Sequence, residues 1–134
     1  MPPEPGPVFF VDASLGRRIV PEALRREGVQ VVAHDDRFGP GTPDAVWLEE
    51  AGRHGWLVLT KDKRIRYREN ERRALQRAGV AAFVFVGKDL TGEEIAKALV
   101  VALPRMIRTA NQTRRPFIAT VTPRGTVRLL LIIT

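Results

Sequence analysis

The acidic residues of this chain gather behind three short apolar segments. Each segment has the length and composition of a buried strand, and carboxylates that directly follow parallel strands meet at one edge of the sheet. Like charges at one edge repel each other unless a cation or a proton neutralises them. Hard oxygen ligands suit Mg²⁺ or Mn²⁺, which can activate water and stabilise the leaving oxygen when a phosphodiester bond is cleaved. The acids concerned are Asp12 after residues 8–11, Asp35 and Asp36 after residues 29–33, Asp62 after residues 56–60, and Asp44 at the start of the intervening helix.

Each of these aspartates also has a purely structural interpretation. An aspartate after a strand is common as a turn or N-cap residue, and Asp44, like Thr42 before it, can cap the helix that begins there. Asp35 and Asp36 point to opposite sides of an extended chain, so only one of them is expected to face the site. The repetition of the pattern over three successive strands nevertheless favours a shared acidic site, with Asp12 and Asp62 as its best supported members.

The segment that follows the third apolar run is strongly basic. The chain carries 22 Lys and Arg against 15 Asp and Glu, a net charge of +7, and arginine in particular can hold phosphate with two hydrogen bonds. One interpretation is a solvated helix face. Its position beside Asp62 and its single tyrosine, which can stack on a base, favour a surface that binds RNA. The residues predicted to bind RNA are Lys63, Arg64, Arg66, Tyr67 and Arg68, and Lys61 is predicted to support the site.

Strands and helices alternate along most of the chain. This order predicts a three-layer α/β/α fold with a central, mainly parallel sheet, to which a C-terminal β-hairpin is added. Residues 1–7 are expected to be a disordered tail, and residues 8–134 a single domain. Pro104 is expected to kink the last helix or to end it early. The predicted strands are 8–11, 29–33, 56–60, 80–86, 117–122 and 126–133, and the predicted helices are 19–27, 44–54, 68–78 and 93–108.

Composition excludes several classes of protein. The chain has no cysteine, so disulfides, zinc–thiolate sites and thiol nucleophiles are absent. It has neither an apolar run long enough to span a membrane nor an N-terminal secretory signal, which leads us to expect a cytoplasmic protein without a membrane partner. No P-loop, dinucleotide-binding glycine motif or nucleophile elbow is present. The apolar last strand, residues 128–134, needs a cover, either from the packing of the hairpin or from a second copy of the chain, and we predict a homodimer.

Two segments resemble a known family. Residues 9–16 (FFVDASLG) look like the opening of PIN-like nuclease domains. Pro43-Asp44, together with residues 56–62 (WLVLTKD), looks like their later signature, in which a helix-borne Asp and a Thr-x-Asp after a strand hold the metal. The resemblance covers roughly residues 8–122. It is closest to the short PIN-like proteins that are grouped with VapC-type toxins.

The resemblance implies a ribonuclease that depends on Mg²⁺ or Mn²⁺, and it suggests the toxin of a toxin–antitoxin pair, with an antitoxin protein as partner. Asp12, Asp44 and Asp62 would then be metal ligands, and Thr60 or Ser14 would support them by hydrogen bonds. Larger PIN domains add a Glu from an early helical segment, which this chain lacks. The substitute predicted for it is Asp36, or Asp35.

Two other functions are compatible with the same residues. A non-catalytic RNA- or protein-binding module on this fold would bind RNA in a salt-sensitive manner, without turnover, and would tolerate the loss of Asp12. A receiver-like phosphoacceptor domain would also gather aspartates at strand ends, and it would become phosphorylated on one of them by a small phosphodonor.

Overall fold

The computed structural model describes residues 6–132, apart from the side chains of Arg66, Tyr67 and Ile132. The described strands form one sheet in the order β2-β1-β3-β4-β5-β6, in which every neighbouring pair is parallel except β5 and β6. The strands are β1 Val8–Val11, β2 Gln30–Ala33, β3 Leu57–Thr60, β4 Ala81–Phe85, β5 Phe117–Val121 and β6 Val127–Ile132. The predicted parallel sheet and terminal hairpin are therefore confirmed.

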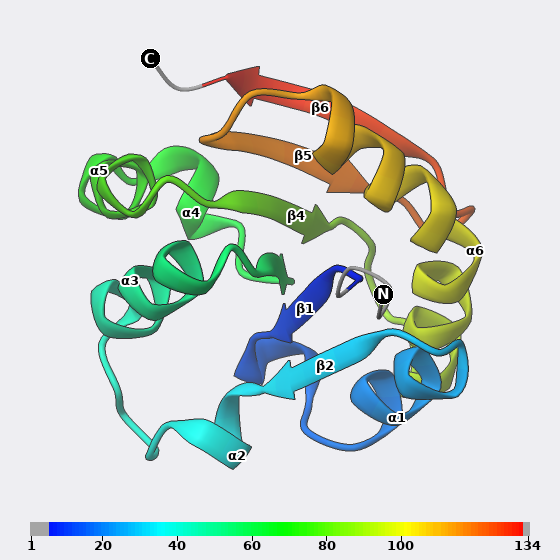
Figure 1. Ribbon diagram of the computed structural model, residues 1–134. Coiled ribbons are helices and arrows are strands. Elements are labelled where there is room, and N and C mark those ends of the chain that lie inside the picture. The colour runs from blue at the N-terminus through cyan, green and yellow to red at the C-terminus, as the bar shows by residue number, and fades with distance from the viewer. Residues whose placement is uncertain (1–5, 133–134) are drawn as a thin grey trace, which may run out of the picture.

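Helices cover both faces of this sheet. Figure 1 shows α1 and α6 on one face and α3, α4 and α5 on the other, so the predicted three-layer arrangement is confirmed. Successive side chains of a strand point to opposite faces. Phe9 and Val11 of β1 accordingly pack in the core beside α1 and α6, whereas Phe10 packs in the core that Trp47 of α3 shares. The helices are α1 Ile19–Arg26, α2 His34–Arg37, α3 Asp44–His54, α4 Arg64–Tyr67, α5 Glu69–Ala78 and α6 Gly92–Gln112, with a 3₁₀ turn η1 at Ala13–Leu15.

The structure differs from the sequence-based expectation at three places. The short helices α2 and α4 are not among the predicted helices, because a four-residue helix has too few positions to show a periodic pattern. The third difference is α6, which continues through Pro104 to Gln112. Pro104 is exposed, and buried residues on either side of it, such as Leu103 and Met106, fix the helix to the sheet. This packing offsets the backbone hydrogen bond that proline cannot make.

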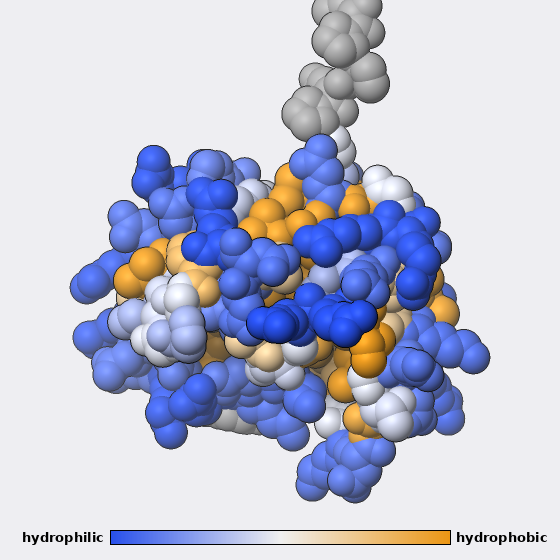
Figure 2. Space-filling view, turned by 90° about the horizontal axis from the view of Figure 1, so that it is seen from below, coloured by the Kyte–Doolittle hydropathy of each residue, from blue (hydrophilic) through white to orange (hydrophobic). Residues whose placement is uncertain are grey.

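The disordered N-terminal tail and the homodimer, which concern the two ends of the chain, stay predictions. The disorder expected for residues 1–7 falls mainly on residues 1–5, which lie outside the described residues. At the other end, β6 forms an edge of the sheet, and Leu129 and Leu130 are 42% and 44% exposed there. Such an edge fits the predicted homodimer. Within residues 6–132, no helix is both long and apolar enough to cross a membrane, and Figure 2 shows a mostly hydrophilic face with small apolar areas.

Close contact between α3 and α5 depends on Gly52. A Cβ atom at this position would collide with the carbonyl oxygen of Ala78, at the end of α5. Because the obstacle is backbone rather than a flexible side chain, the two helices could not keep this contact with any larger residue. Gly52 thus sets the distance between the two helices that flank the carboxyl edge of β3.

We expect Gly52→Ala to lower the free energy of unfolding by about 1–3 kcal/mol, because α3 and α5 must move apart. Urea unfolding followed by circular dichroism measures the change. Gly39→Ala is the matched control, since an added Cβ there meets no atom within 4 Å and the backbone φ is not positive. Equal stability of the two variants would contradict the proposed close packing.

Candidate functional site

Asp12 and Thr60 lie side by side at the carboxyl ends of β1 and β3. The backbone N–H of Asp12 donates to the carbonyl oxygen of Leu59 at 2.9 Å, which extends the pairing of these strands by one residue. From β1 the chain continues to β2 on one side of it, whereas β3 lies on the other side. The strand order therefore reverses between β1 and β3, and open α/β sheets usually bind ligands at such a point. Alternation places Asp12 on the side of Phe10, toward α3 and α5.

The carboxylate of Asp12 is held by two hydroxyl groups. Thr60 Oγ1 donates to Asp12 Oδ2 at 2.7 Å, and Ser14 Oγ donates to the same oxygen at 2.8 Å. The hydroxyls also accept hydrogen bonds from the chain that follows β3: Lys61 N–H donates to Ser14 Oγ and Asp62 N–H donates to Thr60 Oγ1, each at 3.0 Å. Asp12 is only 8% exposed. Both hydroxyls that the sequence offered as alternatives therefore fix its orientation, and both leave Oδ1 out of these bonds.

Asp44 joins this pair from the first turn of α3. Sequence reasoning allowed Thr42 or Asp44 as the helix cap, but the N-cap is Pro43 and no side chain caps the helix. Instead, Asp44 Oδ1 accepts a hydrogen bond from Trp47 Nε1 at 3.1 Å. Burial raises the pKa of Asp44 above its ordinary value against the effect of this bond, and the negative charges of Asp12 and Asp62 raise it further. Asp12 and Asp62 thus both lie within electrostatic reach of Asp44.

Asp62 is the third of these acids, and it is already paired with a cation. Its carboxylate contacts the guanidinium of Arg64, with the shortest distance, 2.6 Å, between Arg64 Nη2 and Asp62 Oδ2. This hydrogen-bonded pair holds the pKa of Asp62 below its ordinary value, despite partial burial that acts in the opposite direction. Asp62 is therefore held in its ionised form by a guanidinium that contacts both of its oxygens.

Glu71 of α5 is an acid that sequence reasoning did not single out. Its Oε2 atom is closed to solvent and makes no hydrogen bond among the described residues. Burial raises the pKa of Glu71, and the charges of Asp62 and Asp44 add to the effect. The signal available in the sequence was weak, because Glu71 sits inside a run of charged residues that is typical of a solvated helix.

Asp35 and Asp36 lie elsewhere. Both belong to α2, where Asp35 Oδ1 is 2.9 Å from His34 Nδ1 and Asp36 Oδ2 is 3.8 Å from Arg25 Nη2 on α1. His34 is buried against the rings of Phe10 and Phe38, in keeping with a structural histidine. The contacts described for Asp36 thus point to α1, and its role as a ligand stays a prediction.

The predicted RNA-binding residues follow directly after Asp62. Lys63, Arg64 and Arg68 are exposed, and the positive charges of Arg64 and Arg68 act on Asp62. The side chains of Arg66 and Tyr67 lie outside the described part of the structure. The Lys61 side chain is exposed, and its contribution to the site is the backbone N–H bound to Ser14. This basic rim stays a prediction that its location supports.

The residues present suit a hard divalent cation. The donors are carboxylate and hydroxyl oxygens, as Mg²⁺ and Mn²⁺ prefer, and two of the acids, Asp44 and Glu71, have pKa values raised by burial and by neighbouring carboxylates. The Oε2 atom of Glu71 is buried and accepts no hydrogen bond among the described residues, so a bound cation would take the place of the missing donor. Over residues 6–132, however, no three acidic or histidine side chains stand close enough to share one ion. The donor set therefore fits a metal, but its arrangement must tighten to bind one.

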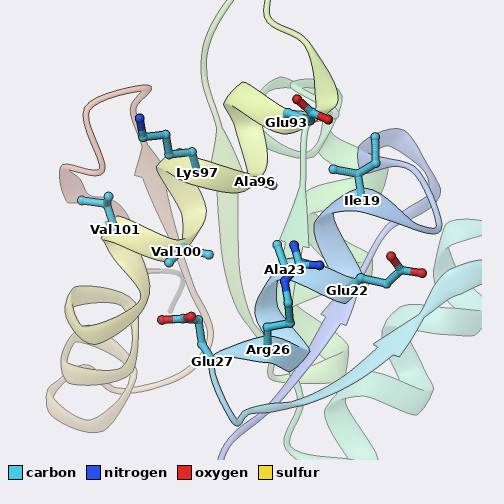
Figure 3. Close-up of a pocket in the computed structure, with 10 residues that line it drawn as sticks. All are labelled: Ile19, Glu22, Ala23, Arg26, Glu27, Glu93, Ala96, Lys97, Val100 and Val101. Carbon is cyan, nitrogen blue, oxygen red and sulfur yellow. The ribbon is translucent and has the colours of Figure 1, made fainter.

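A separate cavity lies between α1 and α6. Figure 3 shows it lined by apolar residues such as Ala23 and Val100 with charged residues of both signs at its rim, and its volume is about 510 Å³. None of the acids Asp12, Asp44 and Asp62 lines it. This cavity and the side chain of Asp12 lie on opposite faces of the sheet, because α1 and α6 cover one face and α3 and α5 cover the face toward which Asp12 points (Figure 1).

We expect Thr60→Val to lower the free energy of unfolding by about 1–3 kcal/mol, because the buried carboxylate of Asp12 loses a donor and the Asp62 N–H loses its acceptor. Chemical denaturation at pH 7 measures this. The matched control is Thr120→Val in β5, whose hydroxyl makes no hydrogen bond among the described residues and whose exchange should change stability by no more than about 0.5 kcal/mol. If both variants are equally stable, Thr60 does not hold the site together.

Comparisons with known proteins identify the family of the chain. A family model described as a PIN-like domain matches residues 7–87, the part of the chain that contains Asp12, Asp44, Asp62 and Glu71. A curated protein of Mycobacterium tuberculosis, provisionally named ribonuclease VapC45, is 32% identical over 126 residues, which cover 91% of this chain and 91% of that protein. No solved structure matches. The chain belongs to the PIN-like domain family.

Proposed function

We propose that this chain is a ribonuclease that cleaves RNA phosphodiester bonds with the help of Mg²⁺ or Mn²⁺. The observation that carries the proposal is the hydrogen-bonded arrangement after β1 and β3, in which Thr60 Oγ1 donates to the carboxylate of Asp12 and accepts from the backbone N–H of Asp62. Asp44 lies within electrostatic reach of both acids, and burial together with their charges raises its pKa. Carboxylates placed close together repel one another, and a bound divalent cation would relieve that repulsion. The printed name of the mycobacterial relative, ribonuclease, supports the same activity.

Each residue of the site has a distinct task in this proposal. Asp12, Asp44 and Asp62 would hold the metal, and Thr60 and Ser14 keep the Asp12 carboxylate in one orientation. A bound divalent cation would supply Lewis-acid polarisation of the phosphate and a more acidic water. Asp36 stays a predicted fourth ligand.

The exposed cations that follow β3 give the substrate a place to bind. Lys63, Arg64 and Arg68 stand directly after Asp62, so phosphates of a single strand bound there would lie beside the acids. The net charge of +7 favours a polyanionic partner. A cytoplasmic toxin that an antitoxin protein restrains is the biological setting that the resemblance to VapC-type proteins suggests.

We expect the purified chain to cleave single-stranded RNA when Mg²⁺ or Mn²⁺ is present, and Asp12→Asn or Asp62→Asn to reduce the rate at least about 100-fold, because each removes a charge that stabilises the metal. Mn²⁺ should raise the melting temperature of the wild-type chain by binding the folded state, and should not do so for Asp12→Asn. Asp89→Asn is the control, because this exposed aspartate has a positive φ that asparagine also adopts.

Cleavage that persists in chelator, or that survives both substitutions, would contradict the proposal. Salt-sensitive RNA binding without turnover, retained in Asp12→Asn, would instead identify a non-catalytic RNA-binding module. Phosphorylation of an aspartate by a small phosphodonor would identify a phosphoacceptor domain.

A further inference from the structure

The carboxylate of Asp62 is fully engaged by one neighbouring side chain. Arg64 Nε lies 2.9 Å from Asp62 Oδ1 and 3.0 Å from Oδ2, and Arg64 Nη2 lies 2.6 Å from Oδ2. The backbone N–H of Arg64 also donates to Oδ1 at 3.0 Å. Both oxygens of the acid therefore face a guanidinium, which carries a full positive charge at any working pH.

The guanidinium of Arg64 also interacts electrostatically with other acids of the site. The pKa of Arg64 is raised, first by its hydrogen bonds to Asp62 and the charge of that residue, and then by the charges of Glu71 and Asp44. The Arg64 side chain is 55% exposed and is paired only two residues along the chain, so it can leave Asp62 without disturbing the core. Arg64 thus contacts Asp62 at the surface and lies within electrostatic reach of Glu71 and Asp44.

Glu71 offers a ligand atom that nothing uses. Its Oε2 is closed to solvent and has no hydrogen-bond donor among the described residues, although it lies within electrostatic reach of Asp62 and Arg64. A buried carboxylate oxygen without a donor costs free energy that a bound cation would offset. Neighbouring Glu69, by contrast, is exposed and accepts a hydrogen bond from Arg73 at 2.6 Å.

We propose that Arg64 holds the cation position of the site in the metal-free chain, and that a divalent metal displaces it from Asp62 with Glu71 as an additional ligand. This inference rests on the proposed function. It accounts for the finding that no three acids among the described residues stand at metal-sharing distance, since a guanidinium fills the place of the ion. Once displaced, Arg64 becomes available to a phosphate of the RNA, so that metal binding and substrate binding support each other.

Competition of this kind is measurable without catalysis. Isothermal titration of the full chain with Mn²⁺, at constant pH and ionic strength and without RNA, should show about five- to tenfold tighter binding in Arg64→Gln, because one repelling charge leaves the site. Arg68→Gln removes the same charge from the same rim but breaks no hydrogen bond to Asp62. Its Mn²⁺ affinity should change less than about twofold. Arg64→Gln should nevertheless cleave RNA more slowly than the wild-type chain, because a phosphate contact is lost.

The role of Glu71 has its own pair of variants. Glu71→Gln should weaken Mn²⁺ binding about tenfold or more, whereas Glu69→Gln, on the exposed side of the same helix, should leave the affinity unchanged. Thermal unfolding of each variant without metal verifies that the fold is retained, so a loss of affinity is not a loss of structure.

The outcomes separate this inference from the proposed function. Mn²⁺ binding that Asp62→Asn abolishes, but that Arg64→Gln leaves unchanged or Arg68→Gln strengthens equally, overturns the exchange and leaves the ribonuclease proposal intact. Normal affinity in Glu71→Gln overturns the assignment of Glu71. An absence of Mn²⁺ binding in both the wild-type chain and Arg64→Gln overturns the inference and the proposed function together.

Discussion

Repulsion between carboxylates at one edge of the sheet is the constraint to which the surrounding structure responds. Asp12, Asp44, Asp62 and Glu71 lie on different segments of the chain. Burial raises the pKa values of Asp44 and Glu71, and neighbouring carboxylates add to the effect, Asp12 and Asp62 for Asp44, and Asp62 and Asp44 for Glu71. Three of these four acids are stabilised by different kinds of hydrogen-bond donor. Asp12 receives two hydroxyl hydrogen bonds, Asp44 an indole N–H, and Asp62 a guanidinium, while the Oε2 atom of Glu71 receives no hydrogen bond among the described residues.

The sheet makes this convergence possible because strands β1 and β3 are neighbours with matched alternation. Phe10 and Val58 face the core beneath α3 and α5, so Asp12 and Thr60, two residues further along their strands, reach the same side. The contact of α3 with α5 at Gly52 then fixes the two helices that bear Asp44 and Glu71. The other face, packed with α1 and α6, contributes stability and carries no acid of the site.

Most of the fold could be predicted from the sequence, because its signals are local. The apolar runs that became β1, β3 and β4 are bounded by glycines and charges, and α3 has the predicted bounds. At the start of α6, Thr91 and Glu94 form both hydrogen bonds of a capping box, a motif that is local in the sequence. The short helices α2 and α4 and the course of α6 through Pro104 escaped prediction, since tertiary packing rather than periodicity decides them.

The sequence by itself determined that acids follow three strands, that the strands run parallel, and that cations follow Asp62; the matches at Asp12 and at Thr60 with Asp62 indicated the family. Only the tertiary structure decided which acids meet. It directs the contacts of Asp36 toward Arg25 on α1 and brings Glu71 within electrostatic reach of Asp62. The physical reason is that strand order and helix packing, neither of which leaves a local trace in a charged helix such as α5, determine the distances between residues far apart in the chain.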